Sequence, residues 1–326
     1  MKRARQITLR LALSAAFVWL ALRGLSAGNV LARVAHAQPD WFLAGLGVLT
    51  ISFVLGALRW RLLVRGQQIE LGVADAARLT WIGLFFTNVL PTGFGGDAVR
   101  VWIAGRRSGA VPAVTASVLA DRLCALWALT GLGAVGVAID AGALPAVIVV
   151  SILTACAVVA LGSMLLLAPA PARLLVRATA RWQRPSQAIA RVGGGLATYA
   201  KRPGLLVSAV AISLLAQVCV IVAAMLLARS LGLNVGASLL STTIPVALLA
   251  TATPTNINGL GVRETVFRAL LVPAGVLPAI AVAFSLITVI AGAIVSLPGA
   301  IAWISLRYRA TAPAPEPNAQ GLVASV

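Results

Sequence analysis

Apolar runs separated by short charged segments make up most of the chain, and this pattern leaves few folds open to it. About 20 apolar residues cross the hydrocarbon core of a bilayer. In lipid, backbone polar groups must be satisfied within the segment, which favours helices. We therefore predict an all-α polytopic membrane protein with six full transmembrane helices, at residues 11–22, 41–64, 111–139, 142–168, 204–228 and 277–306.

The composition agrees with this fold class. Of 326 residues, 60% are hydrophobic and 10% are charged, and the mean hydropathy is +0.99, whereas soluble domains have about 25% charged residues.

Residues 1–10 carry four basic residues before the first apolar run, as a signal peptide does. We predict an uncleaved helix instead, because a further membrane run follows Arg23 and no soluble domain follows for secretion.

Two other apolar segments are interrupted by helix breakers. The sequence NVLPTGFGGDAVR at 88–100 breaks the first, and PTNINGLGVRE at 254–264 breaks the second. Non-helical backbone persists at membrane depth only where it is buried in protein or lines a wet cavity. We therefore predict two re-entrant helical hairpins, at 74–107 and 237–275, and a candidate site at their broken tips.

The two hairpins share a pattern that indicates an internal repeat. Each has Pro-Thr, then glycines, then an acidic residue near an arginine, and Pro91 and Pro254 lie 163 positions apart, half of the chain. Interrupted segments at matching positions, entering from opposite faces, predict an inverted repeat around a midplane site. The alternative is that the shared pattern is a coincidence, because Pro and Gly also interrupt helices in membrane proteins that have no repeat.

Positive charges predict the topology. Most of the 26 Lys and Arg residues lie in segments that the predicted spans place on the same side of the membrane, the cytoplasmic side. Arg59, Arg61 and Arg65 are interpreted as the cytoplasmic end of the second span. We predict a multi-pass protein of the bacterial cytoplasmic (inner) membrane with both termini cytoplasmic. Its predicted parts are a first membrane half at 1–168, a basic connection at 169–203, a second half at 204–306 and a disordered tail at 307–326.

The basic connection carries arginines at 173, 177, 181 and 184, which is helical spacing. This spacing predicts an amphipathic helix on the anionic inner leaflet, and a plain positive-inside loop is the alternative.

The net charge of +18 does not indicate nucleic-acid binding, because the sequence has no soluble basic module with interleaved aromatic residues. We expect membrane lipids as partners, together with either a second copy of the chain or a separate lipid-modifying enzyme.

Six charges fall within the membrane segments: Asp97, Arg100, Asp121, Arg122, Arg263 and Glu264. Each costs about 2.5 to 3.5 kcal/mol at the centre of a membrane helix, so each must pair or face water. Asp121 and Arg122 point about 100° apart on one helix. We therefore expect them to find partners in the two hairpins, either as structural ion pairs or as a receptor for a phosphate-bearing headgroup.

In such a receptor, glycine N–H groups, helix N-termini and arginine forks hold phosphate oxygens, and asparagines add neutral hydrogen bonds. The candidate substrate-binding residues are Asn88, Pro91, Gly95, Gly96, Asp97, Arg100, Asp121, Arg122, Asn256, Gly259, Gly261, Arg263 and Glu264. We expect no cofactor and no metal. The three cysteines lie singly within apolar runs, and the one histidine, His36, lies in a short loop.

At these motifs the sequence resembles the transmembrane region of lysylphosphatidylglycerol synthases, a flippase-like integral membrane family that also occurs as stand-alone proteins. The matching elements are residues 88–100, Ala120-Asp121-Arg122 and GLGVRE at 259–264, in the family's order. The resemblance implies a membrane protein that translocates an anionic lipid or lipid-linked headgroup. Asn258 departs from the family's second glycine, and the aminoacyl-transfer domain is absent, so we do not expect lysyl transfer by this chain alone.

Functions of two classes remain open. In a lipid transporter, the membrane arginines hold the phosphate, while the carboxylates balance them or bind a cationic headgroup or a proton. In an integral membrane transferase acting on a polyprenyl-phosphate or a phospholipid, Asp97 or Glu264 is a general base or metal ligand. An accessory subunit of such an enzyme is a further alternative. The transporter is favoured because the sequence has no Asp-rich metal motif and no nucleophile–histidine pair, and we assign no catalytic residue.

Overall fold

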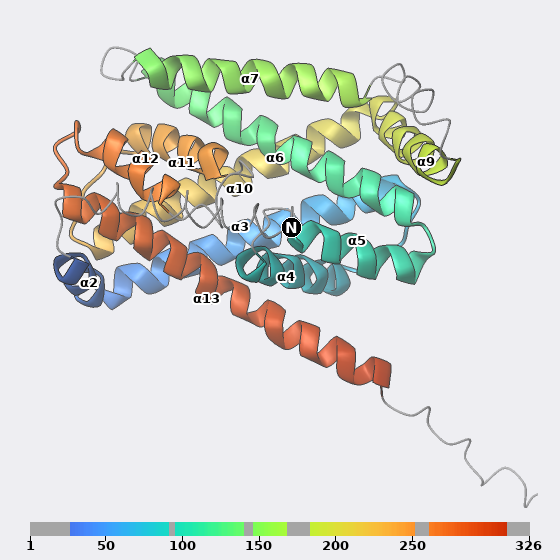
Figure 1. Cartoon of the computed structure of the whole chain (residues 1–326), viewed down its shortest axis with the longest axis horizontal. Coiled ribbons are helices and arrows are strands. Elements are labelled where there is room, and N and C mark those ends of the chain that lie inside the picture. The colour runs from blue at the N-terminus through green and yellow to red at the C-terminus, as the bar shows by residue number, and fades with distance from the viewer. Residues whose placement is uncertain (1–26, 91–94, 140–145, 168–182, 252–260, 312–326) are drawn as a thin grey trace, which may run out of the picture.

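The computed structural model describes residues 27–90, 95–139, 146–167, 183–251 and 261–311 (Figure 1). Within these residues the chain forms helices joined by short turns, and no strand occurs. The helices are α2 (Ala27–Ala35), α3 (Pro39–Gly66), α4 (Val73–Val89), α5 (Gly95–Ser108), α6 (Val111–Ile139), α7 (Ala146–Leu167), α9 (Gln183–Ala200), α10 (Pro203–Ser230), α11 (Ala237–Thr251), α12 (Val262–Leu271) and α13 (Pro278–Thr311).

Five of these helices, α3, α6, α7, α10 and α13, are long and apolar enough to cross a membrane. They coincide with five of the six predicted spans, and the sixth, at 11–22, lies outside the described residues. The predicted fold class, an all-α polytopic membrane protein, is confirmed. One boundary differs, because α13 continues to Thr311 whereas the tail was predicted to begin at 307.

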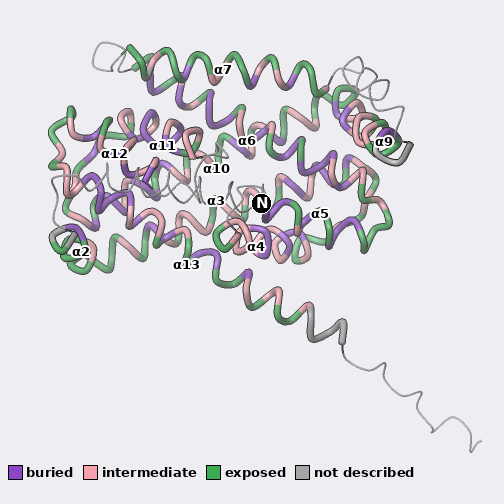
Figure 2. Tube along the Cα trace, viewed as in Figure 1, coloured by how far each residue is buried: buried purple, intermediate pink, exposed green. Residues whose placement is uncertain are grey.

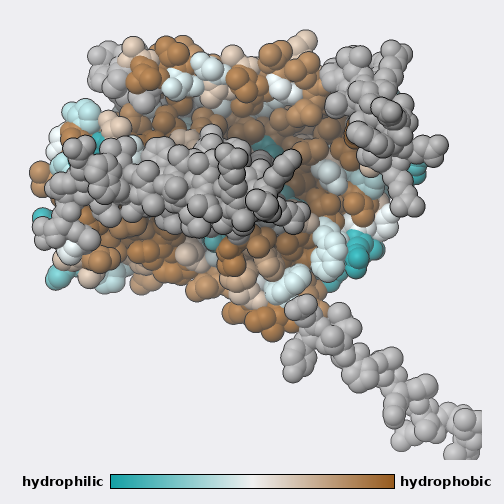
Figure 3. All heavy atoms as spheres, in the orientation of Figure 1, coloured by the Kyte–Doolittle hydropathy of each residue, from teal (hydrophilic) through white to brown (hydrophobic). Residues whose placement is uncertain are grey.

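The surface agrees with a lipid environment. Large apolar side chains stand exposed on the outer helices, among them Met164 at 73% and Ile301 at 71% exposure. Figure 2 shows that α7 is mostly exposed. Figure 3 shows that apolar residues cover most of the described surface on the side of the molecule in view. In water such a surface would promote aggregation, whereas in a bilayer it is the surface that contacts the lipid chains.

Each predicted hairpin is a pair of packed helices, α4 with α5 and α11 with α12. The tips, at 91–94 and 252–260, lie outside the described residues. Gly261 has a φ of 81°, in the left-handed region that favours glycine. Its N–H donates to Oε2 of Glu264 at 2.6 Å, which satisfies an N–H group at the start of α12 that has no partner within the helix.

The order of helices repeats in the two halves of the chain. Helices α3 and α10 both have 28 residues and both begin with a proline, which suits the first helical position. In the first half, α3 is followed by α4 with 17 residues, α5 with 14 and α6 with 29. In the second half, α10 is followed by α11 with 15 residues, α12 with 10 and α13 with 34.

The equivalent helices α3 and α10 run antiparallel and pack together along their length (Figure 1). At one end the N–H of Gln38 donates to the carbonyl of Ser230 at 2.8 Å, and at the other end Gly66 lies against Leu205. Helix α13 packs on α4, and the equivalent α6 packs on α11. Antiparallel equivalents with this exchange of contacts are what an inverted repeat requires.

Glycines make the two exchanged contacts close. A Cβ at Gly299 of α13 would overlap the backbone of Trp81 on α4, and a Cβ at Gly136 of α6 would lie 2.6 Å from Oγ of Ser241 on α11. The indole N–H of Trp81 also donates to the carbonyl of Val295 at 3.0 Å. Small residues that let backbones approach are a common basis of helix association in membranes.

Helix α9 lies in the region predicted as the basic connection. Its apolar side packs on the protein, with Leu196 and Tyr199 buried, and the Tyr199 hydroxyl donates to the carbonyl of Leu63 at 2.8 Å. Burial raises the pKa of Tyr199 above its ordinary value. The arginines at 173, 177 and 181, which predicted an amphipathic helix on the leaflet, lie outside the described residues.

The contact between α13 and α4 predicts the effect of a single methyl group. Gly299→Ala should lower stability by about 1–3 kcal/mol, because the added Cβ overpacks a closed interface. Gly292→Ala, on the same helix, has nothing within 4 Å of the added Cβ and should leave stability unchanged or raise it by up to about 1 kcal/mol through helix propensity. Thermal unfolding in detergent measures both, and equal midpoints for the two variants would contradict the prediction.

Candidate functional site

Helices α5 and α6 form an antiparallel pair that brings the first hairpin's charges to those of α6. The turn between them contains Gly109, whose φ is 67°, and Ala110. Asp97 lies twelve positions before Gly109, and Arg122 lies twelve positions after Ala110. The two residues therefore face each other across the pair, and Nε of Arg122 lies 2.6 Å from Oδ2 of Asp97.

The second carboxylate of the cluster, Asp121, takes its main partner from α3. Nε of Arg59 donates to Oδ1 of Asp121 at 2.6 Å, and Nη1 of Arg59 donates to Oγ of Ser213 on α10 at 3.0 Å. Oδ2 of Asp121 lies 3.6 Å from Nη1 of Arg100. The cluster therefore joins α3, α5, α6 and α10 at one point.

Arg100 bridges the two carboxylates. Its Nη1 lies 3.4 Å from Oδ1 of Asp97 as well as 3.6 Å from Asp121, and its side chain is 9% exposed. Cζ of Arg100 lies 4.1 Å from the ring centroid of Trp60, which is a cation–π distance. Gly83 on α4 makes room, because a Cβ there would lie 2.6 Å from Cδ of Arg100.

One edge of the Arg100 guanidinium remains unpaired. Its Nε and Nη2 are buried and have no hydrogen-bond partner among the residues that the structure describes. A buried donor without a partner costs about 1–3 kcal/mol, so the arrangement favours an acceptor that fits there. Nε and Nη2 lie on the same side of the planar group, and such a fork matches two oxygens of a carboxylate or a phosphate.

The cluster carries one positive charge in excess, because three arginines surround two aspartates. Four of the five side chains are largely buried, between 5% and 13% exposed, whereas Arg122 is 46% exposed. Screening by solvent is therefore weak for all members except Arg122, which is the accessible edge of the cluster. A monoanion bound there would bring the net charge to zero.

The structure brings together four of the predicted site residues, Asp97, Arg100, Asp121 and Arg122. Gly95 and Gly96 lie beside them, buried at the start of α5, and a Cβ at Gly96 would overlap the carbonyl of Gly83. Asn88 is an exposed residue near the end of α4. Pro91, Asn256 and Gly259 lie outside the described residues.

The second hairpin differs from the expectation that both hairpins supply partners to Asp121 and Arg122. Helix α12, which carries Arg263 and Glu264, packs on α11 and α13 and lies apart from α5 along the long axis of Figure 1. Glu264 instead accepts hydrogen bonds from the N–H of Gly261 at 2.6 Å and from the hydroxyl of Ser285 at 3.3 Å. Gly261, Arg263 and Glu264 thus lie outside the cluster.

Sequence reasoning missed Arg59. It was grouped with Arg61 and Arg65 as a marker of a cytoplasmic end, but its side chain is 12% exposed and paired with Asp121. The signal was present in the sequence, because Arg59 lies inside the apolar run 41–64, between Leu58 and Trp60, and Asp121 likewise lies inside a predicted span. Both charges needed a partner for the same reason.

The cluster has donors suited to an anion and lacks the groups that metal binding or proton abstraction requires among the described residues. Among the described residues, no group of three or more His, Cys, Asp or Glu is placed to hold a metal ion. Asp97 and Asp121 each accept from an arginine at 2.6 Å, so neither carboxylate is available as a proton acceptor without breaking an ion pair. The unpaired edge of Arg100 and the exposed Arg122 offer donors to an oxyanion instead.

Comparison with known proteins gives one family. The family described as "Lysylphosphatidylglycerol synthase TM region" matches residues 7–299, a range that includes the cluster and both hairpins. The resemblance predicted from the motifs at 88–100, 120–122 and 259–264 is thereby confirmed. No curated protein matches the chain.

The charge balance of the cluster predicts an asymmetry between two substitutions. Asp97→Asn leaves three arginines around one carboxylate and should cost about 3–5 kcal/mol, as removing one partner of a buried ion pair does. Arg122→Gln removes the excess charge at a half-exposed position and should cost about 1 kcal/mol or less. Unfolding midpoints of the purified variants measure the difference.

The double variant Asp97→Asn/Arg122→Gln is the control for charge. It restores the excess of one positive charge and should be more stable than Asp97→Asn alone. If Arg122→Gln were as destabilising as Asp97→Asn, or if the double variant recovered nothing, the cluster would not be governed by its charge balance.

Proposed function

The chain belongs to the lysylphosphatidylglycerol synthase TM region family, and from this premise we propose that it is a flippase-like membrane transporter that binds the phosphate of an anionic lipid or lipid-linked headgroup. The proposed binding residues are Arg100 and Arg122, with Arg59, Asp97 and Asp121 holding them in place. We place the protein in the bacterial inner membrane with both termini cytoplasmic, in agreement with its basic segments.

The unpaired edge of Arg100 is the observation that carries this proposal. Its Nε and Nη2 are buried donors without a partner among the described residues, on a guanidinium that Trp60 and two carboxylates hold in position. A fixed fork of this kind loses little side-chain freedom when it binds two oxygens. The phosphodiester of a phospholipid supplies such oxygens and one negative charge, which balances the excess positive charge of the cluster.

Arg122 supports the proposal as the accessible member. Its Nε is engaged by Asp97, while the side chain remains 46% exposed. A phosphate at the cluster would compete with Asp97 for Arg122, and Asp97 would keep Arg100 as a partner. Binding therefore exchanges one ion pair for another and leaves no carboxylate unpaired.

The transferase alternative has less support from the geometry. A general base needs an available carboxylate within reach of the proton that it removes, and both carboxylates of the cluster are held by arginines. Glu264 is engaged by the N–H of Gly261 and the hydroxyl of Ser285. For an accessory role, the expected sign is a separate enzyme that co-purifies in a fixed ratio.

The test is lipid movement in proteoliposomes. Wild-type protein should speed the transbilayer movement of a fluorescent anionic phospholipid, and Arg122→Gln should slow it tenfold or more, because the accessible phosphate donor is lost. Arg78→Gln is the matched control, since Arg78 is also a half-exposed arginine paired with an aspartate, Asp75, but lies outside the cluster; it should keep the wild-type rate.

Two outcomes would reject the proposal. One is a wild-type rate equal to that of protein-free liposomes, and the other is an Arg122→Gln rate equal to that of Arg78→Gln. Binding is measured separately: anionic lipid should raise the unfolding temperature of the wild type, as any ligand that binds only the folded state does. It should raise that of Arg122→Gln less.

A further inference from the structure

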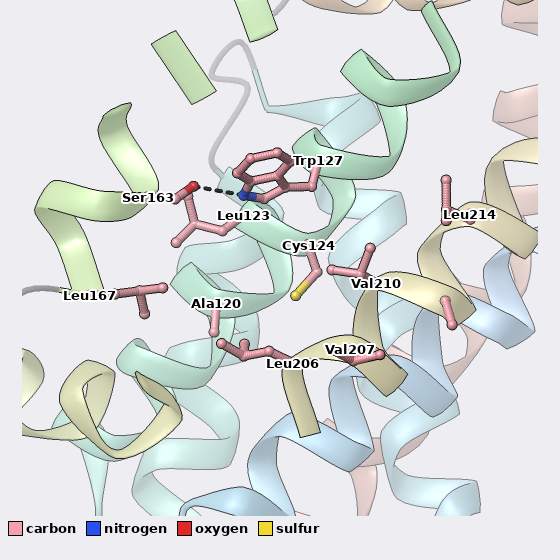
Figure 4. Close-up of a pocket in the computed structure, with 11 residues that line it drawn as sticks. Ala120, Leu123, Cys124, Trp127, Ser163, Leu167, Leu206, Val207, Val210 and Leu214 are labelled. Carbon is pink, nitrogen blue, oxygen red and sulfur yellow. Dashed lines mark hydrogen bonds between the residues drawn. The ribbon is translucent and has the colours of Figure 1, made fainter. Parts of the chain in front are cut away.

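An apolar groove of about 390 Å³ lies between α6, α7 and α10 (Figure 4). Helix α6 packs on both of its neighbours and forms the floor, where Ala120 and Cys124 leave space because they are small. The walls are Ser163 and Leu167 of α7 and five residues of α10: Leu206, Val207, Val210, Ala211 and Leu214.

The groove offers nothing to water. Its two polar side chains satisfy each other, because the indole N–H of Trp127 donates to Oγ of Ser163 at 2.9 Å. Oγ of Ser163 in turn donates to the carbonyl of Val159 at 2.6 Å. Water enters a cavity when it finds polar partners there. All three helices are candidate membrane spans, so the medium around the groove is hydrocarbon.

The groove runs along the spanning helices. Its residues on α6 extend from Ala120 to Trp127 and those on α10 from Leu206 to Leu214, which at 1.5 Å per residue is about 10–12 Å. Leu167 is the last residue of α7, and Leu206 is the fourth of α10. The groove therefore starts close to the membrane surface at which α10 begins and follows the direction in which lipid chains lie.

A cationic pocket lies at that same end of α10. Its volume is about 310 Å³, and it is lined by Gly194, Ala197, Thr198, Lys201 and Arg202. Lys201 and Arg202 are exposed and precede Leu206 by five and four residues. Basic residues at a membrane surface attract anionic lipid headgroups.

We propose that this groove and the adjacent cationic pocket are a binding site for one anionic phospholipid. A hydrocarbon chain lies between α6, α7 and α10, and the phosphate lies at Lys201. The site is separate from the arginine–aspartate cluster, because Arg122 projects about 200° around α6 from Ala120 and bonds to α5. The proposal goes beyond the transport function and does not depend on it.

The test uses an anionic phospholipid with a photoreactive diazirine in the middle of one acyl chain, in bilayer nanodiscs with the full-length protein. Peptide mapping of the wild type should place the label on groove residues of α6 and α10. Ala211→Trp fills the groove from an exposed position and should reduce this label fivefold or more. Ala157→Trp is the matched control, an exposed alanine of α7 that does not line the groove, and should leave the label unchanged.

The headgroup is tested with Lys201→Gln and with a zwitterionic lipid that carries the same photoreactive chain. Groove labelling by the anionic lipid should fall at least threefold in Lys201→Gln and be at least threefold weaker for the zwitterionic lipid. Arg191→Gln, at an exposed position of α9, is the control and should match the wild type. Label spread evenly over the exposed faces of the spans, or unaffected by Ala211→Trp, would overturn the site, and equal labelling by both lipids would overturn its anionic specificity.

Discussion

The bridge that Arg100 makes between Asp97 and Asp121 is the interaction on which the first half of the protein depends. An unpaired charge within a bilayer is costly, so every helix that carries one must be placed against another that balances it. Asp97 on α5, Asp121 and Arg122 on α6 and Arg59 on α3 meet this requirement only at their common position beside Arg100. The arrangement that balances these charges also leaves one positive charge and one guanidinium edge in excess. The same five residues can therefore form a structural ion-pair network and offer donors to an anion.

Two rules were enough to predict most of the fold. Hydropathy located five spans, because a helix in lipid must be predominantly apolar over about 20 residues. The Pro-Gly clusters located both hairpins, because several helix breakers in close succession end a helix, whereas the single prolines 245 and 298 lie inside α11 and α13. Pairing could not be predicted as well. Asp97 and Arg122 are equidistant from the α5–α6 turn, a relation that the sequence contains, but the pairing of Arg59 with Asp121 depends on how α3 crosses α6, which no local pattern encodes. The same limit applies to Glu264, whose motif resembles that of Asp97 while its partners come from Gly261 and Ser285.

The inverted repeat explains why the two motifs look alike and behave differently. Asp97 and Glu264 are each the third residue of the second hairpin helix, where a carboxylate suits the positive end of the helix dipole. That local advantage acts in both halves. The cations do not repeat, because the sixth residue is Arg100 in α5 and Phe267 in α12. The carboxylate is thus a feature of the hairpin, and the arginine is a feature of one half.

The neighbours of Arg100 and of Phe267 show what each half gains. Gly83, the eleventh residue of α4, leaves space for the Arg100 side chain, and the eleventh residue of α11 is Ala247. Trp60 presents its ring to the guanidinium, and the matching residue of α10 is Ala224. Ala224, Ala247 and Phe267 belong to one continuous buried apolar cluster. One half therefore has an apolar core where the other has a buried cluster of charges. The two halves have equivalent backbones, and the side chains make only one of them polar at this position. Because a buried guanidinium needs a ring, a space and two carboxylates together, substituting any one of these positions in the second half would not create a second cluster of this kind.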